Sequence, residues 1–284
     1  MSLGNTLPAY GIVVEKLHHR LTVFQKTVSG KMEILKTYRA VTGKGFGDKS
    51  SRGDLKTPEG VYFATHTLPD EKLPPKYGVF AFVLDFPNVF DRQKRKTGSG
   101  IWVHATDKPN RVLTPFDTEG CVAVTNDDIV DLKKYIVPFQ TPVVIAKEME
   151  TVESYESLVG PREDSLAMVN SWKKSWEIGD FESYRVHYSE DFRSQKVKKK
   201  TWLESKSSLF ERRGKTIEIK LTQPRIVAFE DQLVAVFFQE YISNEKRDFG
   251  QKFLYLKWEN DRYRIVSEKW YPSEPSEDIL QALK

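Results

Sequence analysis

The sequence has a single cysteine, Cys121, in 284 residues, so no disulfide can form within the chain. This excludes the disulfide-stabilised scaffolds that are common among small secreted domains. Long hydrophobic runs are also lacking. The longest strand-like stretches, such as residues 79–84 and 233–238, fall far short of the roughly 18 apolar residues that a membrane-spanning helix needs. The sequence therefore predicts a globular chain without a transmembrane segment.

An excess of charge of one sign is equally lacking, because 44 basic residues nearly balance 40 acidic ones and leave a formal net charge of +4. Such a balance requires no nucleic-acid partner. Two basic runs, residues 92–96 and 196–200, lack the aromatic-rich motifs of nucleic-acid binders, so we interpret them as solvated surface. We therefore expect no nucleic-acid partner. If the two basic runs did bind nucleic acid, the protein would show steeply salt-dependent retention on DNA.

A signal peptide is not visible, because the first residues lack a positively charged segment followed by an apolar core. Residues 1–4 are typical of a cloning remnant, and we interpret residues 1–9 as that remnant or as an N-terminal stub. At roughly 150 residues per domain, the length predicts about two domains. An acidic stretch without apolar periodicity predicts a linker at residues 150–163, between domains at 10–149 and 164–284.

The first domain has the pattern of a β-rich fold, in which short β-branched runs alternate with turn residues. One helix is expected there after Thr125 or Asn126, either of which can cap it. The second domain opens with helical patterns and continues with longer strands, which favours an α+β fold. Helices are expected at residues 126–136, 166–176, 181–188 and 199–210, and strands at 12–15, 21–24, 34–42, 61–64, 79–86, 101–103, 142–146, 216–221, 225–229, 232–241, 252–258 and 263–270.

Cys121 is the main candidate for chemistry. Most single cysteines are buried structural thiols. Cys121, however, follows Gly120, which lets the backbone approach a ligand closely or adopt a conformation closed to other residues. It also precedes the expected helix, whose N-terminus favours a thiolate. His104 ends an expected strand, from which a return loop can bring it to the sulfur.

A nucleophilic cysteine needs a base within hydrogen-bond reach, a group that orients this base, and amides that face the developing oxyanion. His104 is the candidate base, and the backbone carbonyl of Ala105 is the candidate orienting group. The backbone amides of Glu119, Gly120 and Cys121 are candidates for the oxyanion hole. The residue pattern alone leaves a catalytic and a structural cysteine equally open.

Four motifs lie along the first domain: TPEG at residues 57–60, WVH at 102–104, GCV at 120–122 and TPVVI at 141–145. In this order and spacing they resemble the L,D-transpeptidase catalytic domain, the YkuD family. The resemblance implies that Cys121 attacks the peptide bond after the L-centre of meso-diaminopimelate in a peptidoglycan stem, releases D-alanine and forms an acyl-enzyme. It implies His104 as the base and the Ala105 carbonyl as its orienting group. Acyl transfer through a thiolate needs no cofactor.

The chain departs from the usual family motif around the cysteine. The family commonly has Ser-His-Gly-Cys, an apolar residue and Arg, whereas residues 118–123 here are TEGCVA. Ala123 therefore removes a positive charge close to the nucleophile, which changes how a substrate carboxylate is held. Arg111, in the preceding loop, is a candidate replacement. Trp102 and Thr118 are further candidates for substrate binding.

The second domain carries WKKSWEIGD at residues 172–180, YSEDF at 188–192, FFQEY at 237–241 and YRIVSEKW at 263–270. These motifs resemble the NTF2-like superfamily, which implies a cone of helices against a curved sheet and says little about function. A polar pocket lined by Gln239, Tyr241 and Glu268 is a candidate site for a glycan or a wall fragment. The scattered histidines lack metal-ligand spacing, so no metal site is expected.

An L,D-transpeptidase-like domain joined to an NTF2-like domain resembles the cell-shape L,D-carboxypeptidases of curved and helical Gram-negative bacteria. The resemblance implies hydrolysis of the terminal D-alanine from a tetrapeptide stem, in the periplasm, by a protein whose leader is missing from this sequence. Two alternatives stay open. One is transpeptidation, with a second stem or a lipoprotein lysine as acceptor, and the other is a non-catalytic wall- or glycan-binding protein. The oligomeric state is also open, with a homodimer as one alternative.

Overall fold

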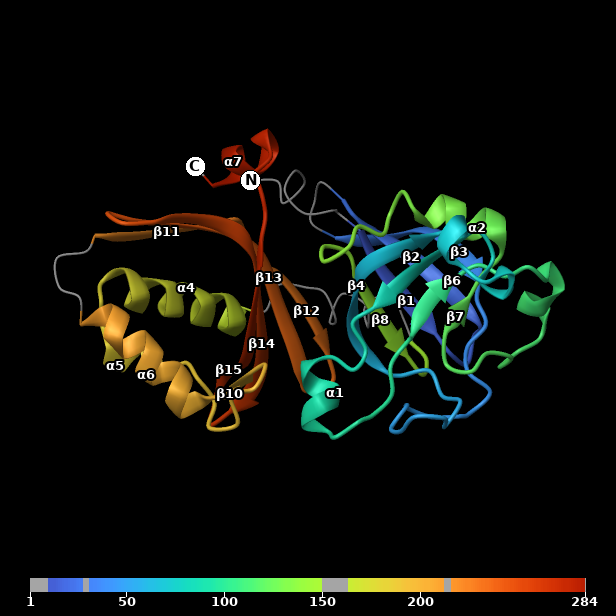
Figure 1. The fold of residues 1–284 in the computed structure, drawn as a ribbon, viewed down its shortest axis with the longest axis horizontal. Coiled ribbons are helices and arrows are strands. Elements are labelled where there is room, and N and C mark those ends of the chain that lie inside the picture. The colour runs from blue at the N-terminus through green and yellow to red at the C-terminus, as the bar shows by residue number, and fades with distance from the viewer. Residues whose placement is uncertain (1–9, 28–30, 150–162, 212–215, 284) are drawn as a thin grey trace. The chain divides into compact units, whose positions relative to one another are not determined.

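The structure is a computed structural model that describes residues 10–27, 31–149, 163–211 and 216–283. The chain divides into two compact units, residues 1–158 and 159–284 (Figure 1). The expected remnant at 1–9 and all but the last residue of the expected linker at 150–163 lie outside the described residues. That last residue, Glu163, begins a helix of the second unit. Within the described residues, no helix is long and apolar enough to cross a membrane.

The first unit is built on one eight-stranded sheet with the order β3-β2-β1-β8-β4-β5-β6-β7. The pairs β1–β8 and β6–β7 are parallel and the others are antiparallel. Apolar side chains from successive strands, among them Ile12, Tyr62, Phe82 and Val103, form one buried core. The strands are β1 (Tyr10–Glu15), β2 (Arg20–Lys26), β3 (Met32–Arg39), β4 (Gly60–Pro69), β5 (Phe80–Leu84), β6 (Trp102–His104), β7 (Val122–Ala123) and β8 (Pro142–Ala146).

Short helices connect these strands. The helix α2 (Asn126–Leu132) begins where the sequence predicts it, because the Thr125 hydroxyl accepts a hydrogen bond from the Asp128 amide at 3.1 Å. It ends before the predicted residue 136. The expectation of a single helix in this domain is wrong, since α1 (Val89–Gln93) also forms, with a reciprocal capping box between Asn88 and Asp91. Short 3₁₀-helices among the described residues are η2 (Asp70–Lys72), η3 (Pro75–Tyr77) and η4 (Pro109–Leu113).

The second unit is an α+β fold, as the sequence predicts. Its main sheet has the order β11-β13-β14-β15, and β12 also pairs with β13. Figure 1 shows α4, α5 and α6 along one face of this sheet. The helices are α4 (Glu163–Glu177), α5 (Phe181–Arg185), α6 (Lys199–Phe210) and α7 (Glu277–Ala282), and the strands are β9 (Arg193–Ser194), β10 (Val197–Lys198), β11 (Ile217–Leu221), β12 (Arg225–Phe229), β13 (Gln232–Ser243), β14 (Arg247–Glu259) and β15 (Arg262–Pro272).

Aromatic side chains fill the space between the helices and the sheet of the second unit. Trp172, Tyr184 and Tyr188 are fully buried and belong to one apolar core with Phe237. The Trp172 indole donates a hydrogen bond to the Tyr188 hydroxyl at 3.1 Å, so a polar atom inside this core has a partner. The long aromatic motifs of the second domain are therefore core positions of the fold.

Candidate active site

The parallel pair β6–β7 brings Cys121 and His104 onto one face of the sheet. Val103 is paired with Val122 and His104 with Ala123, so Cys121, just before β7, lies level with Trp102. Side chains alternate along a strand, and Val103 and Val122 are buried in the core. Cys121 therefore shares the other face with His104. Cys121 and His104 are thus diagonal neighbours on adjacent strands, offset by two residues in register.

His104 is held in one tautomer by its neighbour. Its Nδ1 hydrogen-bonds the backbone carbonyl of Ala105, and because a carbonyl only accepts, Nδ1 carries the proton and Nε2 keeps its lone pair. The ring is buried, and burial lowers the pKa of His104 to about 4, helped by the positive charges of Arg111 and Lys76. His104 is thus neutral at pH 7 and able to accept a proton.

Cys121 is partly buried, and its Sγ lies 3.4 Å from the Gly100 carbonyl oxygen. Burial raises the pKa of the Cys121 thiol to about 11, although the Trp102 backbone and the Arg111 charge act in the opposite direction. The expectation that the following helix favours a thiolate is therefore wrong. The helix α2 starts only at Asn126, beyond β7, and a helix-end effect fades within about one turn.

The loop that carries Cys121 is organised by Thr118. Its hydroxyl donates to the Cys121 carbonyl at 2.7 Å and accepts from the Gly120 amide at 3.1 Å. Its backbone amide donates to the Thr42 carbonyl at 3.0 Å, which ties the loop to the chain after β3. Thr118 is only 2% exposed, so the structure places this expected substrate-binding residue beneath the loop. The Gly120 amide, one of the three expected oxyanion donors, already has Thr118 as a partner.

Glycine is required at position 120 on two counts. Its φ of +128° lies in a region that other residues rarely adopt. A Cβ added there would lie 2.7 Å from the Lys56 carbonyl oxygen and 3.2 Å from the Ile101 side chain. Gly120 is therefore packed directly against the backbone of the segment before β4. The positive φ confirms the expectation that glycine allows a conformation closed to other residues, whereas the packing against Lys56 was not foreseen.

Arg111 lies close enough to lower the pKa of both Cys121 and His104. Its guanidinium is engaged by Asp117, with Nε 2.8 Å from the carboxylate and a terminal nitrogen 2.9 Å from the backbone carbonyl. Ala123 is fully buried in a small apolar cluster with Val41 and Val112. The positive charges that act on the sulfur are those of Arg111 and Lys76, which lie in other segments of the fold.

Tyr77 and Lys76 are site residues that the sequence interpretation missed. The Tyr77 ring lies 5.0 Å from the His104 ring, edge to face, and 4.8 Å from the ring of Trp102. The Lys76 ammonium lies 4.9 Å from the centre of the Tyr77 ring. Both residues sit on η3, which has no motif and no periodicity. Trp102, an expected substrate contact, is only half-buried and forms one wall of this cluster.

The comparisons with known proteins agree with this geometry. The L,D-transpeptidase catalytic domain (YkuD) matches residues 9–145, and the Cds6 C-terminal NTF2-like domain matches residues 164–269. The solved structure of Bd1075 from Bdellovibrio bacteriovorus is 35% identical, covers 95% of each chain and superposes with a TM-score of 0.75. The chain belongs to the L,D-transpeptidase (YkuD) family. A search of the curated proteins finds no match.

A second solved relative of this L,D-transpeptidase-family chain is Pgp2 from Campylobacter jejuni, a helical cell shape determining protein. It is 27% identical, and the match covers 93% of this chain and 94% of that one with a TM-score of 0.70. Both relatives match across both domains. The two-domain arrangement of a YkuD domain and an NTF2-like domain is therefore shared along almost the full length.

In the NTF2-like domain, the three expected pocket residues share the face of the sheet that the helices cover. Gln239 and Tyr241 alternate with Phe237 along β13 on the core side. Glu268 is opposite Leu254, also a core residue. Glu268 is buried and paired with Lys252 at 2.8 Å, and it accepts a hydrogen bond from the Tyr188 hydroxyl. The sequence interpretation did not foresee Lys252 as its partner.

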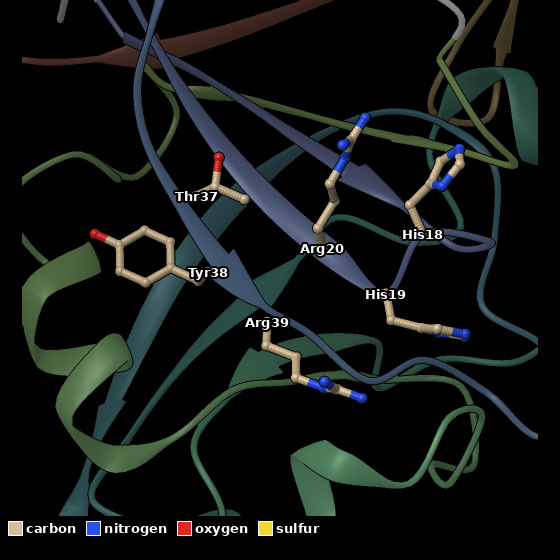
Figure 2. Close-up of a pocket in the computed structure, with 6 residues that line it drawn as sticks. All are labelled: His18, His19, Arg20, Thr37, Tyr38 and Arg39. Carbon is tan, nitrogen blue, oxygen red and sulfur yellow. The ribbon is translucent and has the colours of Figure 1, made fainter.

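A hollow of about 340 Å³ on the YkuD domain lies apart from the catalytic pair. Its lining contains neither Cys121 nor His104. Figure 2 shows Arg39 and His19 extending together toward one side, while Arg20 extends away from them. These arginines have internal partners: Arg20 pairs with Glu15, and Arg39 donates to the Val112 carbonyl at 2.7 Å. Arg39 thereby holds η4, the segment that carries Arg111. The hollow is lined by His18, His19, Arg20, Thr37, Tyr38 and Arg39.

No group of histidine, cysteine and acidic residues able to hold a metal ion occurs among the described residues. His18 and His19 adjoin each other but belong to the hollow just described. The arrangement that remains for chemistry is a thiol, a neutral imidazole with an orienting carbonyl, and backbone amides beside a glycine. These are the parts that acyl transfer through a cysteine requires.

Proposed function

We propose that the chain is a peptidoglycan L,D-carboxypeptidase that removes the terminal D-alanine from tetrapeptide stems. The observation that carries the proposal is the pairing of β6 with β7, which places the Cys121 thiol on the same face as a His104 imidazole oriented by the Ala105 carbonyl. Membership of the L,D-transpeptidase family supplies the substrate class.

The first half of the proposed reaction forms a thioester. His104 Nε2 accepts the thiol proton while Cys121 Sγ attacks the carbonyl carbon at the L-centre of meso-diaminopimelate. The amides of Glu119 and Cys121 are the proposed donors to the oxyanion, because the Gly120 amide is held by Thr118. The C–N bond then breaks, and His104 returns its proton to the nitrogen of the leaving D-alanine.

The second half releases a tripeptide stem. Water attacks the thioester carbon and His104 accepts a proton from this water. The C–S bond then breaks, and His104 returns the proton to the sulfur, which regenerates the thiol. Because the pKa of Cys121 is raised and that of His104 is lowered, both groups are neutral in the free protein at pH 7. Proton transfer therefore accompanies attack in each half, and the imidazole must be correctly placed before attack begins.

Transpeptidation is the alternative, since the same acyl-enzyme can react with an amine instead of water. The likeness to a cell shape determining protein favours trimming. Incubation with purified muropeptides distinguishes the two. Tripeptide monomers that appear with the wild type and not with Cys121→Ala support hydrolysis, whereas new diaminopimelate-linked dimers would overturn it.

A non-catalytic wall-binding protein is the third reading, and the same experiment tests it. Such a protein would retain muropeptides without changing them, and Cys121→Ala would bind them as the wild type does. Because peptidoglycan lies outside the inner membrane, the proposed substrate also implies the periplasm as the place of action. Fractionation of cells that express the natural protein tests this location.

We place a second contact with the wall in the NTF2-like domain, at the expected pocket of Gln239, Tyr241 and Glu268. The Gln239 side-chain oxygen is buried and has no hydrogen-bond partner among the described residues. Aromatic rings and cations line the same core: the Lys252 ammonium lies 5.6 Å from the Trp270 ring centre. Such a set suits a glycan or wall fragment. Calorimetric titration of soluble wall fragments into the Cys121→Ala protein, with and without Gln239→Ala, tests this contact.

A further inference from the structure

Two cations act on the catalytic pair, and they differ in whether a partner neutralises them. Arg111 and Lys76 each lower the pKa of Cys121 and of His104. Arg111 is bound by Asp117 through both its carboxylate and its carbonyl. Lys76 is exposed and forms no ion pair within the part of the chain that the structure describes. Of these two cations, Lys76 is therefore the one without a counter-ion among the described residues.

The side chain of Lys76 is exposed, but the backbone that carries it is held close to His104. The helix η3 (Pro75–Tyr77) ends at Gly78, whose φ is +64°. A Cβ at Gly78 would lie 2.5 Å from the Ala105 Cβ and 2.7 Å from the Thr106 amide nitrogen. The chain after η3 is thus packed directly against the residues that follow His104. This contact fixes Lys76 relative to the base.

Aromatic rings continue this link from the base to the cation. The Tyr77 ring contacts the His104 ring edge to face at 5.0 Å and the Trp102 ring at 4.8 Å, and the Lys76 ammonium lies 4.9 Å from the centre of the Tyr77 ring. The ammonium is therefore one ring away from the imidazole. A ligand that reaches past His104 along this wall meets a positive charge with no counter-ion.

We propose that Lys76 is a specificity residue that binds the terminal carboxylate of the stem peptide. The proposal rests on the proposed carboxypeptidase function. His104 must protonate the nitrogen of the leaving D-alanine, so the leaving residue lies on the imidazole side of the sulfur, where Tyr77 and Lys76 are. Its carboxylate is one residue beyond the scissile carbonyl, a span of roughly 3.5 Å.

Recognition of this carboxylate has a chemical consequence for substrate choice. A tetrapeptide stem places its terminal carboxylate one residue after the cleaved bond, whereas a pentapeptide stem places it one residue further away. A stem cross-linked through its terminal carbonyl has no carboxylate there at all. Lys76 thus favours free tetrapeptides over both other stems. The diaminopimelate side chain carries a second carboxylate, which is the other group in the stem that the Lys76 ammonium can bind.

The test compares three synthetic tetrapeptides: the free acid, the terminal D-alaninamide, and a peptide amidated on the diaminopimelate side chain. Release of the fourth residue is measured with the wild type, Lys76→Ala and Lys76→Arg. Lys133→Ala is the matched control, because Lys133 also lies over an aromatic ring, at 4.6 Å from that of Phe80, yet does not shift the pKa of Cys121 or His104.

We expect the wild type to prefer the free acid over the terminal amide by about tenfold in kcat/KM, the size of one charge-assisted hydrogen bond. Lys76→Ala should abolish this preference, with a larger effect on KM for the free acid than on kcat. Lys76→Arg should retain part of it, and Lys133→Ala all of it. An undiminished preference in Lys76→Ala would overturn the proposal. The proposal would also be overturned if Lys76→Ala lost only the discrimination between the free acid and the peptide amidated on its diaminopimelate side chain.

Failure of the carboxypeptidase function gives a different result. In that case the wild type releases nothing from any of the peptides. Binding then tests Lys76 without turnover. The affinities of the free acid and of the terminal amide are measured for Cys121→Ala and for the double variant Cys121→Ala/Lys76→Ala. A preference for the acid that disappears with Lys76 supports the carboxylate site, and equal affinities for the two peptides contradict it.

Discussion

The hydroxyl of Thr118 donates a hydrogen bond to the backbone carbonyl of Cys121 at 2.7 Å while it accepts one from the Gly120 amide at 3.1 Å. One buried side chain thereby closes the loop that presents the nucleophile. Serine can make the same two hydrogen bonds, whereas valine has the shape of threonine and can make neither. This pair of substitutions separates the role of the hydroxyl from that of the side-chain volume.

We expect Thr118→Val to lower kcat for D-alanine release by about 10- to 100-fold, because a small displacement of a nucleophile has effects of this size. The free energy of unfolding should also fall by about 1–3 kcal/mol, since a buried amide and a carbonyl lose their partner. Thr118→Ser should keep most of kcat. Steady-state kinetics and urea unfolding measure both effects. A wild-type kcat in Thr118→Val would show that the loop keeps its shape without the hydroxyl.

Gly120→Ala should inactivate the protein or prevent its folding. The added methyl group would lie 2.7 Å from the Lys56 carbonyl oxygen, and φ is +128°. Gly53→Ala is the matched control, because Gly53 also has a positive φ, +81°, but nothing lies within 4 Å of its would-be Cβ. The control should lose only about 1–2 kcal/mol from backbone strain. Thermal unfolding and D-alanine release compare the two, and equal losses would rule out the packing explanation.

Much of the fold, and the choice of Cys121 and His104 as candidates, were open to prediction because both depend on local patterns. Period-two alternation marks the strands, and Thr125 marks the start of α2. Gly120 before Cys121 marks a loop where the backbone must come close to other groups. His104 follows an apolar run that can only be a buried strand. Each of these signals lies within a few residues of the element that it predicts.

The rest of the site depends on contacts between distant segments, which no local pattern carries. Tyr77 meets His104 because Gly78 packs against Ala105. The raised pKa of Cys121 results from burial by the folded chain, so the proximity of α2 led to the opposite expectation. The partner of Glu268 was likewise hidden, because Lys252 lies on a neighbouring strand of the sheet.

The buried pair of Glu268 and Lys252 should stabilise the NTF2-like domain. Glu268→Gln leaves the Lys252 ammonium buried without its counter-charge, so we expect the free energy of unfolding to fall by about 3–5 kcal/mol. Glu190→Gln is the control, because Glu190 pairs with Lys199 but is 93% exposed at its side chain. It should cost less than about 1 kcal/mol. Urea unfolding measures the free energy of unfolding of both variants. Equal losses in the two would contradict a stabilising role for the buried pair.

The same pair gives a dependence of stability on pH. Burial alone would raise the pKa of Glu268, but Lys252 and Lys206 outweigh it and the pKa is lowered. The folded state therefore binds fewer protons than the unfolded state just below the unfolded pKa of about 4.3. The contribution of Glu268 is fully present above that pH and is lost as the pH falls further. In Glu268→Gln, the free energy of unfolding should fall less steeply at acid pH than in the wild type. An unchanged fall would show that other groups cause it.

Alkylation of Cys121 should report the protonation state of the catalytic pair. With a thiol pKa of about 11, only about one molecule in ten thousand is a thiolate at pH 7, against a few per cent for an ordinary cysteine. Iodoacetamide should thus react at least a hundredfold more slowly than with free cysteine. Its rate should rise about tenfold per pH unit up to the region of the pKa.

This profile separates two mechanisms for the same residues. A preformed thiolate–imidazolium pair would react at a rate that is already constant below pH 8, and His104→Ala would then slow the reaction by removing the positive charge. A neutral pair predicts a log-linear rise through that range, with little change in His104→Ala, because iodoacetamide needs the thiolate alone. D-alanine release should nevertheless depend on His104 at every pH, since proton transfer to the imidazole accompanies attack. A plateau below pH 8 would show that the thiol is ionised before substrate arrives, and the concerted transfer would have to be abandoned.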